Sequence, residues 1–179
     1  MKAVMISIRK EHNEKIFSGV KKWEGRKTVP AIVTIWNTLQ NDCDYKPSAT
    51  DVIFYIYDPK SGGGCGKVVG EFVCDFAQSF PRNRAAWSEI AKALCVDIDF
   101  VHKYFSKEYG YMIRVCNPVK YDTPKELSEF ERKLRCCHFP CSKEYQGKRN
   151  ACNFFDKNCE HPVAVERPPQ SWCYVEELV

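Results

Sequence analysis

Residues 51–57 constrain the fold more than any other stretch, because they are apolar on both faces of an extended chain. Side chains alternate between the two faces of a strand, so such a strand has to be covered on both sides. A second strand is predicted over 67–76, with one face made of Val68, Gly70, Phe72, Cys74 and Phe76. Glu71 lies on the opposite face between two valines. A carboxylate in apolar surroundings is costly unless a cation lies nearby, so Glu71 is a candidate functional residue.

The other periodic segments predict a mixed α+β fold. Further strands are expected over residues 3–8, 111–116 and 172–175. A short helix is expected over 10–18, and two more helices contain the apolar stripes around Trp87 and Val101. Short strands without a regular alternation of strand and helix favour a small mixed β-barrel with two to three flanking helices.

Length and composition indicate one globular domain over residues 1–179. Hydrophobic residues make up 44% and charged residues 28%, which is ordinary for a protein with a real core. No run approaches the roughly 18 apolar residues of a membrane span, and the first apolar stretch is too short for a signal peptide. We therefore expect a cytoplasmic protein that does not enter a membrane. The net charge of +4 is compatible with an anionic partner such as RNA.

The densest chemical signal is the stretch 18–27, where a short helix gives way to a charged strand. Gly19 is placed to end the helix in a left-handed conformation. One face of the following strand carries Lys22, Glu24, Arg26 and Thr28. The opposite face carries Trp23 and Val29. From this stretch alone, a solvated edge strand and a functional site are both open interpretations.

The pattern Gly19-x-Lys21-x-x-Glu24-x-Arg26, after a short strand and helix, resembles the signature of ASCH domains, which belong to the PUA-like superfamily. Three later segments resemble further strands of this family and follow in the right order, namely residues 66–72, 110–115 and 168–174. The resemblance covers residues 1–30, 51–128 and 168–179. It implies a PUA-like pseudobarrel, in agreement with the fold class that the strand and helix pattern predicts.

The resemblance implies that the protein binds RNA or a nucleotide in a cleft beside the motif strand. We expect this cleft to be lined by Lys21, Glu24, Arg26 and Glu71. Lys22 would add a phosphate contact, and Trp23 would stack on a base if it is exposed, the alternative being a core aromatic. A glutamate can accept a hydrogen bond from a cytosine amino group, and an arginine can bind a phosphate or a carbonyl.

The resemblance also implies an enzymatic alternative, because some ASCH-type proteins are amidohydrolases of N4-acetylcytidine and others resemble ribonucleases. The amidohydrolases use a lysine after the motif glycine, a threonine three residues on and a glutamate on the central strand. Lys21 and Glu71 match the first and last of these, but Glu24 stands in place of the threonine, so the hydroxyl nucleophile is absent. Lys21, Glu24 and Glu71 remain candidates for acid–base hydrolysis of RNA or a modified nucleoside. An internal ion-pair cluster is the structural alternative.

Residues 131–167 differ in composition from the rest of the chain, and we interpret them as a cysteine-rich insertion. They contain few large apolar side chains, so this segment cannot bury much surface by itself. The candidate ligands of a structural zinc ion are Cys137, Cys141, Cys152 and Cys159. Cys136 or His161 could replace one of them, and disulfides or reduced thiols stay open as alternatives.

Overall fold

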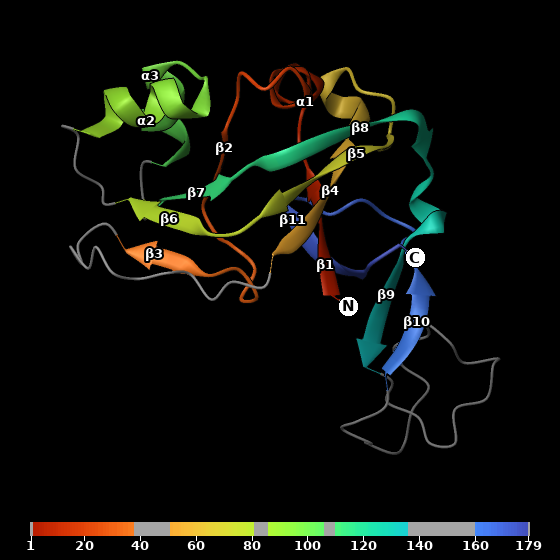
Figure 1. Ribbon diagram of the computed structural model, residues 1–179. Helices are drawn as coiled ribbons and strands as arrows, with labels where there is room; N and C mark the ends of the chain where they lie inside the picture. The colour runs from red at the N-terminus through yellow and green to blue at the C-terminus, as the bar shows by residue number, and fades with distance from the viewer. Residues whose placement is uncertain (1, 38–50, 81–85, 106–109, 136–159, 179) are drawn as a thin grey trace.

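The computed structural model describes residues 2–37, 51–80, 86–105, 110–135 and 160–178 (Figure 1). One sheet contains β1 (Lys2–Ser7), β4 (Val52–Asp58), β5 (Lys67–Cys74), β8 (Cys116–Lys125) and β11 (Trp172–Glu176). A second sheet contains β2 (Trp23–Arg26), β3 (Ile35–Asn37), β6 (Ala77–Phe80) and β7 (Gly110–Arg114). The α-helices of the described residues are α1 (Lys10–Phe17), α2 (Trp87–Leu94) and α3 (Ile98–Tyr104). The predicted α+β class with two to three helices is thereby confirmed.

The first sheet has the strand order β11-β1-β4-β5-β8, and its central strand β4 is buried on both faces, as the sequence predicts. Phe54 and Ile56 belong to one apolar cluster, whereas Tyr55 and Tyr57 belong to another on the opposite face. The ring of Phe54 stacks on that of Phe72 in β5, with the ring centroids 5.0 Å apart. β1 runs parallel to β4, and the other neighbours in this sheet are antiparallel. The centre of this sheet therefore separates two cores.

A long antiparallel ribbon passes from the first sheet into the second, which has the strand order β2-β7-β6-β3 (Figure 1). β5 leads into β6, and β7 leads into β8, with only one or two residues between them. Since β5 pairs with β8 and β6 with β7, the same two chain segments contribute to both sheets. Among the described residues no strand pairing joins the outer strands of the two sheets, so closure of the barrel stays a prediction.

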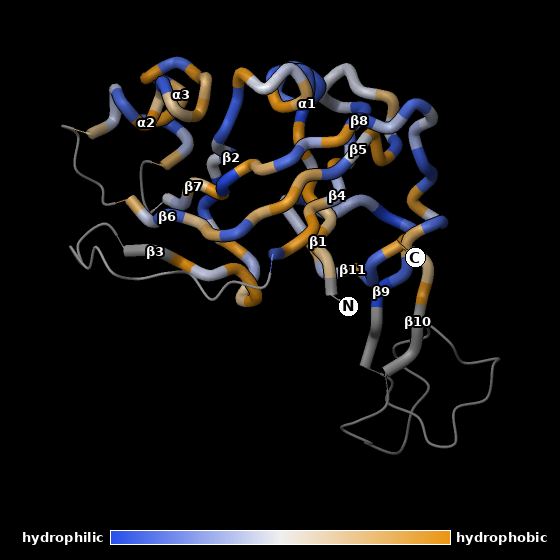
Figure 2. Tube along the Cα trace, in the orientation of Figure 1, coloured by the Kyte–Doolittle hydropathy of each residue, from blue (hydrophilic) through white to orange (hydrophobic). Residues whose placement is uncertain are grey.

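The helices cover different parts of the sheets. α2 and α3 pack on the second sheet, where Trp87, Leu94 and Phe105 form an apolar cluster with Phe80 and Met112. α1 lies beside β4 and β8 and is mainly hydrophilic, as its blue colour in Figure 2 shows. α2 also contacts β2, the strand that carries the motif residues.

Residues 131–167 contain two antiparallel strands, β9 (Glu131–Arg135) and β10 (Glu160–Ala164), in which Arg135 pairs with Glu160. The candidate zinc ligands Cys137, Cys141, Cys152 and Cys159 lie outside the described residues, as does Cys136. Within the described ranges, no group of three or more His, Cys, Asp or Glu side chains is placed to hold a metal ion. A helix long and apolar enough to cross a membrane is also absent from these ranges.

Candidate functional site

The charged stretch after α1 turns into the protein. Gly19 has a φ of +75°, which glycine adopts without strain and which ends the helix as the sequence predicts. The N–H of Lys21 then donates to the carbonyl of Lys15 at 2.8 Å, and the chain enters β2. Lys21, Glu24 and Arg26 expose only 2%, 6% and 8% of their surface. The predicted shared face of Glu24 and Arg26 is confirmed, and the interpretation of β2 as a solvated strand is wrong.

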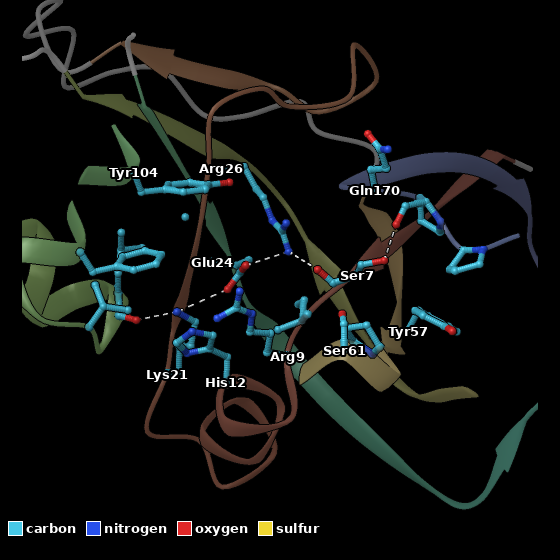
Figure 3. A pocket seen from close by; sticks show the side chains of 18 residues that line it. Ser7, Arg9, His12, Lys21, Glu24, Arg26, Tyr57, Ser61, Tyr104 and Gln170 are labelled. Atoms are coloured by element: carbon cyan, nitrogen blue, oxygen red, sulfur yellow. Dashed lines mark hydrogen bonds and ion pairs between the residues drawn. The ribbon is translucent and has the colours of Figure 1, made fainter. Parts of the chain in front are cut away.

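The carboxylate of Glu24 lies between two cations (Figure 3). Its Oε2 is 3.3 Å from Nζ of Lys21, and its Oε1 is 2.9 Å from Nη2 of Arg26. Buried charges attract each other more strongly than charges in water, but removing them from water is costly. Such a cluster therefore needs further hydrogen bonds to be stable.

Two backbone carbonyls supply these hydrogen bonds. Nζ of Lys21 donates to the carbonyl of Leu94 at 2.5 Å, and Nη2 of Arg26 donates to the carbonyl of Ser7 at 2.6 Å. Leu94 is the last residue of α2, where carbonyls lack helical partners and the helix dipole is negative. The cluster thus ties β2 to α2 and β1, and its two cations outweigh its single carboxylate.

The charged cluster forms part of the wall of a cavity of about 510 Å³ (Figure 3). This volume lies within the range of small-molecule sites. The wall also includes the end of β1, the start of α1, the turn between α2 and α3, and the segment before β11. Ser7, His12, Tyr57 and Gln170 come from these elements and from the end of β4. Three of the four predicted cleft residues, Lys21, Glu24 and Arg26, therefore line one cavity.

His12 adds an imidazole to this wall, beside the cluster (Figure 3). Burial lowers the pKa of His12, and the positive charge of Lys21 lowers it further, against an opposing effect of Glu24. Nδ1 of His12 and Nε of Arg26 are buried and have no hydrogen-bond partner among the described residues. The sequence analysis did not include His12 in the site. Its position in the helix just before the motif was the available signal.

Two aromatic side chains of α3 form another part of the wall. Phe100 and Tyr104 are stacked, with ring centroids 5.3 Å apart and an interplanar angle of 13°. Nζ of Lys27 lies 5.0 Å from the centroid of the Tyr104 ring. Phe100 exposes 41% of its surface, so part of this aromatic side chain is open to solvent at the cavity. The sequence analysis missed this pair, because a spacing of four residues is also that of a core-facing helix stripe.

The expectation that Glu71 shares this cavity does not hold. Glu71 accepts a hydrogen bond from the hydroxyl of Tyr121 in β8, and it is not among the described residues that line the cavity. It lies opposite Tyr55 in the ladder between β4 and β5. Strand alternation gives the correct face for Glu71, but that face packs toward β8 and the C-terminal segment instead of β2.

Lys22 and Trp23 also lie away from the described cavity wall. Lys22 is exposed to solvent. Trp23 packs edge-on against Phe76, with ring centroids 5.7 Å apart, and contacts the apolar cluster of α2 and α3. The core alternative therefore describes Trp23 better than a role in stacking on a base.

Crystal structures of an ASCH protein from Zymomonas mobilis are similar to this chain along nearly its whole length. That protein superposes with a TM-score of 0.58 at 16% sequence identity, covering 98% of this chain and 88% of the other. The chain has the ASCH fold. Two single-residue variants of the same protein give TM-scores of 0.57 at 16% and 17% identity, and cover 98% and 99% of this chain and 89% and 92% of theirs. No protein-family model and no curated protein sequence matches the chain.

Proposed function

We propose that this protein binds RNA or a nucleotide, with one base held in the cavity against the β2 cluster. The observation that carries the proposal is the buried carboxylate of Glu24, held on a cavity wall between Lys21 and Arg26. A buried charge cluster costs desolvation free energy, and well-packed apolar side chains in its place would often make the fold equally stable. Its place on the wall of a cavity therefore favours a role in binding. The resemblance to ASCH domains implies the same class of ligand.

The polar part of the wall is complementary to the edge of a nucleobase. Glu24 offers a carboxylate that can accept from an exocyclic amino group, such as that of cytosine. Nε of Arg26 has no hydrogen-bond partner within the described parts of the chain, so it can donate to a base carbonyl or to a phosphate oxygen. Because two cations face one carboxylate in the cluster, the remaining positive charge suits an anionic ligand.

The aromatic part of the wall is suited to the flat face of a base. Phe100 and Tyr104 lie within the cavity wall, and Phe100 keeps a large part of its ring surface open to solvent. Unstacked bases of RNA commonly pack on such aromatic side chains. The exposure of Phe100 is thus accounted for if a base covers it in the bound state.

Calorimetric titration with the four ribonucleosides and their 5′-monophosphates tests the proposal. We expect saturable binding of at least one of them at low salt. Phe100→Ala should weaken this binding about tenfold, since stacking of one base on an aromatic side chain contributes roughly 1–3 kcal/mol. Ile98→Ala is the matched control, because Ile98 lies on the same helix and exposes 43% of its surface but is not part of the cavity wall. Absence of saturable binding for all eight compounds and for short RNA would contradict the proposal.

Hydrolysis of RNA or a modified nucleoside is the second candidate, and His12 is the observation that favours it. An imidazole with a lowered pKa is neutral at pH 7 and can accept a proton from water or a hydroxyl group. The set implied by the amidohydrolases is not assembled, because Glu71 lies elsewhere and Glu24 replaces the threonine. Chromatography of the ligands after incubation decides the matter. Product that forms with the wild type and not with His12→Gln supports catalysis, and binding without any product argues against it.

A further inference from the structure

A second groove continues the cavity along α1. It has a volume of about 370 Å³ and lies between α1 and the turn that joins α2 to α3. Arg9, His12, Val96 and Phe100 line both the groove and the cavity. Since four residues are common to both, the two form one continuous depression. We refer to the second part as the α1 groove.

Charged side chains dominate the α1 groove. Arg9 directly precedes α1 as its N-cap, and His12 and Lys15 follow at intervals of three residues, so that all three line the groove along the helix. Lys92 comes from α2, and Arg9, Lys15 and Lys92 are all exposed. The carboxylates of the groove are Glu11 and Asp97. The cavity and the groove together are lined by five cationic side chains and three carboxylates.

The cations of the groove remain available to a ligand. In the part of the chain that the structure describes, none of the ion pairs involves Arg9 or Lys92. Lys15 donates to the carbonyl of Cys95 at 3.0 Å, which fixes α1 against the end of α2. An ammonium group has three protons, so this bond leaves Lys15 able to donate again.

We propose that the α1 groove binds the phosphate group of a nucleotide whose base lies in the cavity. This inference rests on the proposed function and assigns a place to the phosphate group of the ligand whose base that function puts in the cavity. Arg9 and Phe100 line both the cavity and the groove, so one ligand can place its base on Phe100 and its phosphate at Arg9. Lys15 and Lys92 add charge-assisted contacts to the phosphate oxygens. A free mononucleotide and an RNA strand both present this group.

The test compares the affinities of a ribonucleoside, its 5′- and 3′-monophosphates and the corresponding dinucleotide. We expect one monophosphate to bind at least about tenfold more tightly than the nucleoside, because hydrogen bonds to charged groups are stronger than those between neutral groups. This ratio should fall with added salt. It should also fall several-fold in Lys92→Ala. Lys120→Ala is the control, since Lys120 is an exposed lysine on β8 outside both described linings, and the ratio should stay at its wild-type value.

The outcomes separate this inference from the proposed function. If the nucleoside and both monophosphates bind equally, the phosphate is not held and only the inference fails. If the ratio is high but neither Lys92→Ala nor Arg9→Ala lowers it, the phosphate lies elsewhere and the inference is again overturned. If none of the ligands binds, the proposed function fails as well. A dinucleotide that binds more tightly than both monophosphates supports the groove with RNA as the source, and equal affinities support it with a free nucleotide.

Discussion

The charge of Glu24 should be essential for the stability of the fold, and Glu24→Gln removes it with little change in shape. In the wild type this one carboxylate lies 3.3 Å from Nζ of Lys21 and 2.9 Å from Nη2 of Arg26. After the substitution, both cations stay buried without the negative charge, and they keep the carbonyls of Leu94 and Ser7 as acceptors.

The expected loss follows from this geometry. Removing one partner of a buried ion pair destabilises a protein by about 3–5 kcal/mol, because an uncompensated charge stays buried. The glutamine oxygen still accepts one hydrogen bond, so we expect the lower end, about 3 kcal/mol. For a domain of this size, that corresponds to a fall in Tm of roughly 6–12 °C.

Urea unfolding, followed by circular dichroism, measures the loss. Glu126→Gln is the control, because Glu126 lies 2.6 Å from Nζ of Lys67 but both side chains are largely exposed. Although this pair is the closer one, solvent screens it, so its loss should change the midpoint much less. A midpoint for Glu24→Gln as high as that of Glu126→Gln would refute the reasoning that burial, and not distance, makes the cluster strong.

Three further predictions concern other parts of the chain. Burial lowers the pKa of His12 below its ordinary value of 6.5. As the pH falls below 6.5, the imidazole therefore gains a proton in the unfolded chain while it stays neutral in the folded chain, and the free energy of unfolding falls. Urea unfolding at pH 7.5 and 5.5 should therefore show a larger loss of stability in the wild type than in His12→Gln, and equal losses would contradict this. Gly70→Ala should destabilise the protein by about 1–3 kcal/mol, because the new Cβ would lie 2.2 Å from the carbonyl oxygen of Val119. An unchanged midpoint of urea unfolding would be evidence against the pairing of Gly70 with β8. The zinc proposal for residues 131–167 predicts about one zinc ion per chain by elemental analysis, and loss of protease resistance in this segment after chelation; zinc-free protein with a resistant segment would exclude it.

The sequence was most informative where one periodic pattern determines one structural property. The run around Phe54 and Tyr55 predicts burial on both faces, because consecutive apolar side chains on a strand point in opposite directions. The alternation of Glu24 and Arg26 likewise predicts one shared face, and the structure confirms it. The order of the motif segments was sufficient to predict the ASCH fold.

The sequence did not predict which segments pack against a given face of a strand or helix. Alternation places Glu71 opposite the buried side of β5, but only the pairing of β5 with β8 decides that Tyr121 lies over it. Phe100 and Tyr104 have the spacing of a core stripe, and only the packing of α3 against α2, which itself contacts β2, brings them to the cavity. Such contacts join segments far apart in the sequence, and no local pattern encodes them.

The most direct test of the central claim is a titration of ¹⁵N-labelled protein with the mononucleotide that binds best, followed by the backbone amide resonances. Our account predicts that the largest shifts occur in Glu24 and Gly25 of β2 and in Phe100 and Tyr104 of α3, the elements that form the cavity wall. Shifts concentrated around Glu71 and Tyr121, with β2 and α3 unchanged, would show that the ligand binds on the other side of the sheet and would contradict the account.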